Sequence, residues 1–135
     1  MISVAVECSC DFSHELYKYE NSFRFIERWD EPSLKEARDF TREISEKITT
    51  ISPAQLLYKI STEPGLKKSV ITAFNFWEGI WISHEHNRIS DKLLKDAFAK
   101  TYTDMYENFK HWIEDTRNDP KMRETLKNLY DLWRN

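Results

Sequence analysis

The stretch from Leu66 to His84, LKKSVITAFNFWEGIWISH, constrains the fold more than any other part of this sequence. Its apolar side chains recur at the spacing of three and four residues that marks one face of an α-helix. That face carries Leu66, Val70, Ala73, Phe74, Trp77, Trp81 and His84. A second face carries Thr72, Phe76, Gly79 and Ser83, and the only polar stripe carries Lys68, Asn75, Glu78, Ile82 and Glu85. A helix with two faces to bury is expected at the centre of a bundle.

Gly79 lies within this helical pattern, where glycine costs about 1 kcal/mol relative to alanine. We therefore expect a neighbouring helix to approach closely at this position. The segment does not satisfy the requirement for a membrane span, about 20 predominantly apolar residues. Lys67 and Lys68 lie near its start and Glu78 interrupts its apolar run.

The rest of the chain predicts amphipathic helices that pack around residues 66–84. The expected helices run from His14 to Trp29, from Pro32 to about Ile48, from Pro53 over a short distance, from Ser90 through Trp112, and from Pro120 through Trp133. The first of these has Leu16, Tyr19, Phe23 and Ile26 on one face, with Phe12 near its start. Only two glycines and four prolines occur in 135 residues, which favours long helices with short connections. The predicted fold is all-α, a single-domain bundle of about five to six helices spanning residues 14–135.

A different pattern precedes the bundle. Between residues 2 and 12, Ile2, Val4, Val6, Cys8, Cys10 and Phe12 alternate with smaller or polar residues. Period-two alternation with β-branched residues predicts an extended segment, which we place over residues 1–13. No second alternating run exists to complete a sheet. The segment therefore pairs with its copy in another subunit, lies extended over the bundle, or is disordered.

The charge and the cysteines narrow the setting in which the protein acts. A net charge of −3 does not favour binding to nucleic acid. Cys8 and Cys10 are too close in sequence for an unstrained disulfide, and the chain has no other cysteine. The start of the chain has no basic segment followed by an apolar core, so we expect no signal peptide and a cytoplasmic location.

Residues 84–88, HEHNR, form the densest cluster of chemically capable side chains. We interpret them as a helix C-terminus, where histidine and arginine interact favourably with the helix dipole and the last carbonyls. The alternative is a metal site on His84 and His86, which requires the helix to end first because alternate helical residues point about 200° apart. Cys8, Cys10 and His14 offer further ligands, although structural zinc sites usually separate their cysteines by two or more residues. The cysteines also fit as small apolar residues, and we predict no cofactor.

Two further groups are candidates for a binding site. Glu78 becomes an acid–base group if it faces the core, and an ordinary surface carboxylate if its stripe faces water. The aromatic residues exceed what the core stripes require, which is typical of an interface or a ligand groove as well as of an enlarged core. The candidates at stripe edges are Tyr102, Tyr106 and Tyr130, and the candidates for lining an internal pocket are Trp77, Glu78 and Trp81.

Three segments of the sequence resemble a known family. They are FRFIERWDEPSLKEARDF, NFWEGIWISHEHNRISDKLLKDAF and FKHWIEDTRNDPKMRETLKNLYDLW. They are similar to the uncharacterised bacterial family called domain of unknown function 4760, over roughly Tyr17 to Trp133. The resemblance implies a small helical protein without an assigned activity. Many members of that family have a membrane anchor before the helical part, and this chain departs from them because residues 1–13 are too few and too polar to span a bilayer.

The sequence carries no nucleophile motif, and two glycines exclude phosphate-cradling loops. The main expectation is a non-enzymatic module that binds a protein partner, with a second copy of the chain as one candidate. The alternatives are a metal-dependent enzyme or metal sensor at the His84 and His86 cluster, and a small-ligand binder in the bundle core.

Overall fold

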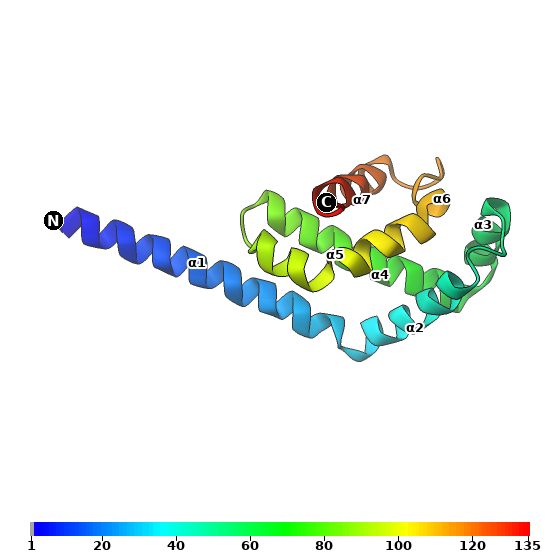
Figure 1. The fold of residues 1–135 in the computed structure, drawn as a ribbon, viewed down its shortest axis with the longest axis horizontal. Coiled ribbons are helices and arrows are strands. Elements are labelled where there is room, and N and C mark those ends of the chain that lie inside the picture. Colours follow the sequence, from blue (N-terminus) through cyan, green and yellow to red (C-terminus); the bar gives the residue numbers. More distant parts are fainter. Residues whose placement is uncertain (1) are drawn as a thin grey trace.

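The structure, a computed structural model, describes the backbone of residues 2–135 and the side chains of residues 12–135. Within this part of the chain there are seven helices and no strand. The helices are α1 (Ile2–Trp29), α2 (Pro32–Glu46), α3 (Pro53–Thr62), α4 (Pro64–Glu85), α5 (Asp91–Asn108), α6 (Lys110–Ile113) and α7 (Pro120–Trp133). The chain is an all-α, single-domain bundle, as the sequence predicts (Figure 1).

Helix α4, which contains the apolar stretch, touches each of the other six helices. It packs most extensively against α2, and it also packs against α3 and α7. Its aromatic rings meet those of α1, α5 and α6. The fully buried side chains of α4 include Val70, Ala73, Trp77 and Ile80.

An aromatic cluster joins α1, α4 and α5 at the middle of the bundle. It consists of Trp29, Phe76, Trp77, Phe98 and Tyr102. The ring of Trp77 lies 4.8 Å from that of Trp29 and 5.1 Å from that of Tyr102, centroid to centroid. Such tilted and edge-on contacts add to the stabilisation that comes from burying the rings. We call this group the aromatic cluster below.

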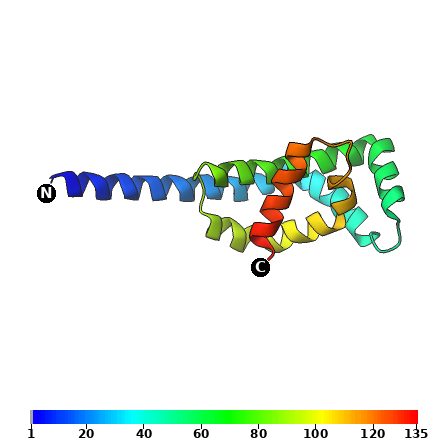
Figure 2. The same cartoon turned by 90° about the horizontal axis from the view of Figure 1, so that it is seen from above.

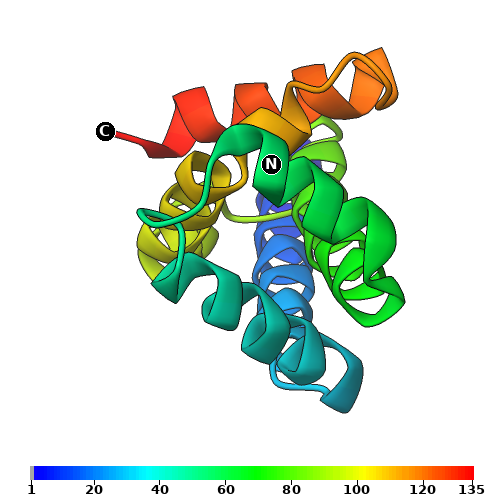
Figure 3. The same cartoon turned by 90° about the vertical axis from the view of Figure 1, so that its right-hand side faces the viewer.

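Helix α7 covers α4 and α5 from one side, crossing them steeply (Figure 2). Leu126, Leu129 and Trp133 are its buried residues that face them. The buried hydroxyl of Tyr102 donates a hydrogen bond to the main-chain oxygen of Leu126, which links α5 to α7. Seen along the long axis of the molecule, α1 lies in the middle of the view, between α4 and α5 (Figure 3).

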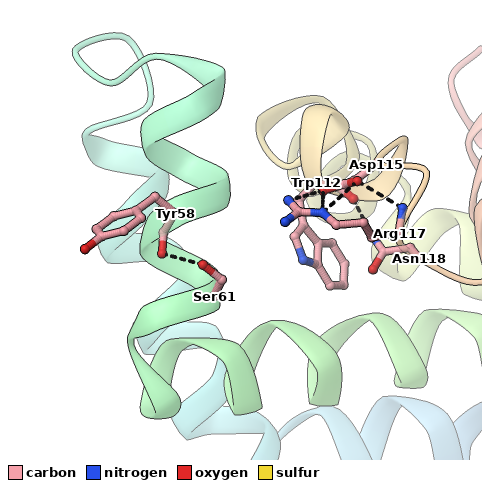
Figure 4. Close-up of polar contacts among 6 residues, drawn as sticks. All are labelled: Tyr58, Ser61, Trp112, Asp115, Arg117 and Asn118. Atoms are coloured by element: carbon pink, nitrogen blue, oxygen red, sulfur yellow. Dashed lines mark hydrogen bonds and ion pairs between the residues drawn. The ribbon is translucent and has the colours of Figure 1, made fainter.

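The loop between α6 and α7 is held by its own side chains. Asp115 accepts two hydrogen bonds from the guanidinium of Arg117 through its Oδ2, and Asn118 donates to the carbonyl oxygen of Trp112 (Figure 4). The bonds from Arg117 hold the pKa of the Asp115 carboxyl below its usual value. Asp119 then caps α7 by accepting from the amide of Lys121. The long helix predicted to run past Ser90 to Trp112 therefore exists as α5 and α6, which meet at Phe109.

The prediction of an extended segment before the bundle is wrong. Helix α1 runs from Ile2 to Trp29 without a break at residue 13, so residues 2–13 belong to the same helix as the residues that follow them. A lone extended segment leaves its backbone N–H and C=O groups without partners, whereas a helix pairs them within the segment. The N-terminal half of α1 projects well beyond the rest of the molecule (Figures 1 and 2). In residues 2–135 we find no helix with the length and apolarity needed to cross a membrane.

Candidate protein-interaction site

The middle of α1, from Phe12 to Phe23, exposes a row of large apolar side chains. Phe12, Leu16, Tyr19 and Phe23 are exposed by 70%, 48%, 46% and 52%. Their spacing of four, three and four residues places them on one face of the helix. We call these four residues the apolar stripe. The next residue in the series, Ile26, is partly buried against the core.

The residues that border the apolar stripe are acidic or small. Glu15 lies along one edge, and Glu20 and Glu27 lie along the other. All three are exposed. Glu15 has a cationic neighbour on its own helix, since its Oε1 lies 3.4 Å from the Nζ of Lys18. Both edges of the stripe therefore carry carboxylates, and the one at Glu15 is paired with Lys18.

A different face of α1 attaches the helix to the bundle. Trp29 enters the aromatic cluster, and Phe25 contacts Phe76 with its ring edge-on at 5.8 Å. Ser22 is completely buried, and its Oγ accepts a hydrogen bond of 2.8 Å from the amide of Ser90. Asn21 donates to the carbonyl oxygen of Arg88 over 3.1 Å. These contacts fix α1 from its middle to its end and leave the apolar stripe uncovered.

The segment that holds the middle of α1 is the C-terminal cap of α4. Asn87 has a φ of 55°, the left-handed conformation that ends many helices. The amide of Asn87 donates to the carbonyl of His84 and the amide of Arg88 donates to the carbonyl of Ser83. This pair of bonds is a Schellman motif, which satisfies carbonyls at the end of the helix. The Asn87 side chain donates in turn to the Nε2 of His14 on α1 over 3.2 Å.

Residues 84–88 therefore serve as a helix cap in the structure. The Nδ1 of His84 lies 3.8 Å from a carboxylate oxygen of Asp91, and His86 is the exposed C-cap residue of α4. Among the side chains of residues 12–135, no three histidines, cysteines, aspartates or glutamates are gathered as metal ligands. Cys8 and Cys10 lie outside the residues whose side chains are described.

Three of the predicted interface or ligand residues belong to the core. Trp77, Tyr102 and Tyr106 are buried. Tyr102 and Tyr106 therefore expose little surface to a partner, and the lining of an internal ligand pocket by Trp77 stays a prediction. The two tyrosines were placed beside the apolar stripes by sequence spacing, but neighbouring helices cover those edges as well. Trp81 is partly buried, with its ring 5.2 Å from that of His84. Tyr130 is partly buried too, stacked on Tyr106 at 4.3 Å.

Glu78 occupies an intermediate position at the edge of α4. Its side chain is half-buried, and burial raises the pKa of its carboxyl, with a smaller contribution from the negative charge of Asp119. No hydrogen bond or ion pair of Glu78 accompanies this shift among the contacts of residues 12–135. A shallow groove of about 590 Å³ lies beside α3 at Ala54 and Tyr58, and Glu78 does not line it. Tyr58 projects from α3 there (Figure 4).

A comparison with protein families gives one result. The family described as "Domain of unknown function (DUF4760)" matches residues 12–133. The chain belongs to this family. The DUF4760 match begins at Phe12 and so includes the whole apolar stripe. No curated protein and no solved structure matches the chain.

Sequence reasoning found the stripe but not its exposure. The spacing of Leu16, Tyr19 and Phe23 correctly predicts one helix face, and we expected that face to pack on the bundle. Of that face only Ile26 packs against the core, and the other residues of α1 that pack are Ser22, Phe25 and Trp29. Phe25 and Trp29 are four residues apart, which indicates a second apolar face on α1. We missed that signal in the sequence of this DUF4760 protein.

Proposed function

We propose that this protein is a non-enzymatic interaction module, in which the projecting helix α1 docks against a helix of a partner polypeptide. The exposed apolar stripe is the observation that carries this proposal. A monomeric protein rarely leaves a large contiguous apolar patch in water, and such patches mark interaction sites. Apolar residues spaced by four, three and four are also the anchors by which helices pair with one another.

The attachment of α1 supports the same function. Because Trp29 lies in the aromatic cluster, the helix is anchored in the most buried part of the molecule. The hydrogen bond between Ser22 and Ser90 fixes its rotation, so the stripe faces away from the bundle. A docking surface held in this way loses little conformational freedom on binding, which favours affinity.

The setting we propose is the cytoplasm of a bacterial cell, with a protein as the partner and no nucleic acid. The net charge of −3 supports this choice of partner, because phosphate backbones attract basic surfaces. The acidic edges of the stripe also favour a protein partner over an anionic lipid surface.

The test is to insert a photo-crosslinking amino acid at Leu16 in the full chain and to expose cells to light. Tyr58 is the matched control, since its side chain is an exposed aromatic on a different helix. We expect protein adducts of discrete mass at position 16 and not at position 58, and we expect Phe23→Glu to abolish them.

Equal labelling at both positions would contradict the proposal. A second arm measures co-sedimentation with vesicles of phosphatidylcholine and phosphatidylglycerol. Binding to vesicles that Phe23→Glu abolishes would replace the proposed protein partner by a lipid surface.

A further inference from the structure

We propose that the groove between α2 and α5 binds a small organic oxyanion, a carboxylate or a phosphate ester, through Arg38 and Arg42. The groove has a volume of about 420 Å³, which lies within the range of small-molecule binding sites. None of the residues that line it belongs to the apolar stripe, so the groove is separate from the proposed docking surface.

The two helices meet across this groove with largely polar faces. Helix α2 contributes Arg38, Thr41, Arg42 and Ser45, and α5 contributes Thr101, Asp104, Met105 and Asn108. Each set has the spacing of three and four residues that marks one face of a helix. Helices that pack directly on one another usually bury apolar residues at such positions. These two faces are therefore better suited to a polar ligand than to each other.

The buried residues that line the groove form its base, and they are mainly apolar. Trp29 and Met105 are each exposed by only 8%. Because Trp29 also belongs to the aromatic cluster, the base of the groove is part of the core. A ligand here meets an apolar base and charged side chains together, a combination typical of sites for small organic molecules. This favours an anion carried on a carbon skeleton over a bare inorganic ion.

Arg38 lies against this base and has hydrogen-bonding capacity left over. Its guanidinium carbon lies 5.2 Å from the centroid of the Trp29 ring, a cation–π contact. Its Nε is buried and has no hydrogen-bond partner among the described residues. Its Nη2 lies 3.4 Å from a carboxylate oxygen of the exposed Asp30, and exposed pairs of this kind contribute little. Turning the guanidinium toward an oxyanion replaces these weak contacts with charge-assisted hydrogen bonds.

The charges around the groove favour a negative ligand. Arg42 follows Arg38 by one helical turn and is exposed, with only Asp39 near it, at 3.7 Å. Asp104 is the one carboxylate among the described residues that line the groove, and the Nζ of Lys100 lies 3.0 Å from its Oδ2. The lining therefore carries two guanidinium groups and one carboxylate that is already paired. Planar guanidinium groups match the geometry of carboxylates and phosphates, which sets the chemical class of the ligand.

Titration followed by two-dimensional ¹H–¹⁵N NMR tests this proposal, because it detects arginine Nε–H groups together with the backbone amides. The probes are phenyl phosphate, benzoate and inorganic phosphate, each added to the full chain at constant ionic strength. We expect phenyl phosphate or benzoate to shift the Nε–H signal of Arg38 and amides of α2 and α5, with a dissociation constant of about 1–10 mM. The tighter of these two probes identifies the anionic group. Inorganic phosphate should bind several-fold more weakly, because it lacks the apolar part.

Three variants locate the binding. Arg42→Gln leaves Arg38 and the buried base unchanged and should weaken binding by about fivefold to tenfold. Asp104→Asn removes a negative charge from the groove and frees Lys100, so it should tighten binding by about twofold to fivefold. Arg134→Gln is the matched control, since this exposed arginine does not line the groove, and it should leave binding unchanged. The backbone amide spectrum reports whether each variant is folded.

The absence of a saturable shift with all three probes would overturn the proposal. Equal weakening by Arg42→Gln and Arg134→Gln would overturn it too, because it would indicate a general attraction of anions to the surface. Tighter binding of inorganic phosphate than of phenyl phosphate would exclude an organic ligand. The crosslinking at Leu16 tests the proposed function separately, so either result stands without the other.

Discussion

Two regions of one helix use the same kinds of side chain in opposite environments. At the end of α1, Trp29 lies in the aromatic cluster among rings from α4 and α5. In its middle, Phe12 and Tyr19 are exposed on a face that no other element of the described residues covers. The rings of the aromatic cluster are buried within the chain, whereas those of the apolar stripe are largely exposed. The difference shows that aromatic content alone does not distinguish a core from an interface.

The difference between the aromatic cluster and the apolar stripe is tested most strongly by removing one ring from each. Trp77→Ala should cost about 3–5 kcal/mol of unfolding free energy, because it removes a fully buried ring. Phe23→Ala should change it by about 0.5 kcal/mol or less in the monomer. Urea denaturation at low protein concentration, followed by circular dichroism, measures both. Equal losses would mean that the stripe belongs to the core.

A second pair of substitutions compares polar residues on the two faces of α1. Ser22→Ala leaves the partly buried amide of Ser90 without its acceptor, which should cost about 1–2 kcal/mol. Ser13→Ala, at an exposed position of the same helix, should have no cost and serves as the control. If thermal melting shows the same small effect for both, the α4–α5 connection does not hold the middle of α1.

Substitution of Gly79 tests how closely α4 approaches the face of α1 that is attached to the bundle. A Cβ atom at this position would lie 3.7 Å from the Cε1 of Phe25, an ordinary van der Waals contact. The neighbouring helix expected from the sequence is present, but it leaves room for a methyl group. Gly79→Ala should therefore stabilise the protein, by up to about 1 kcal/mol through helix propensity. A lower melting temperature would show that α1 lies closer to α4 than this distance indicates.

The smallest expected effect concerns the charge of Glu78 at the edge of α4. Burial, and secondarily Asp119, raise the pKa of this carboxyl above its ordinary value of 4.5. A raised pKa in the folded state means that stability is retained below the ordinary value and lost as the pH rises through the folded value. Glu78→Gln should therefore raise the melting temperature slightly at pH 7, and this gain should vanish below pH 4.5. A gain that persists in acid would assign the effect to packing instead.

The sequence predicts the bundle because its signals are local. The spacing around Trp77 and the capping serine at Ser90 each indicate an element that the structure contains, and Ser90 does accept a hydrogen bond from the amide of Leu93. Which face of a helix packs inward depends on contacts with residues far away in the sequence, so local spacing does not predict it. For α1 it depends on where Trp29 and Ser22 find partners, which lie more than forty residues away in α4 and beyond it.

The N-terminal segment and the candidate residues were harder to predict for related reasons. Alternation over residues 2–12 has the period of a strand, but no second strand exists to bond with it, and the backbone bonds of a helix prevail. Tyr102 and Tyr106 sit beside a stripe in sequence, yet α7 covers that edge of α5. At residues 84–88, the informative residue was Asn87, which adopts the left-handed conformation more readily than other non-glycine residues.

Amide hydrogen exchange along α1, followed residue by residue by NMR at two protein concentrations, tests the central claim most directly. We predict that amides near Trp29 are protected at both concentrations, and that amides between Phe12 and Tyr19 exchange faster than these when the protein is dilute. Exchange between Phe12 and Tyr19 that is equally slow at both concentrations would show that this segment of α1 is covered within a single chain. Exchange there that stays fast at both would show that the apolar stripe does not recruit a second copy.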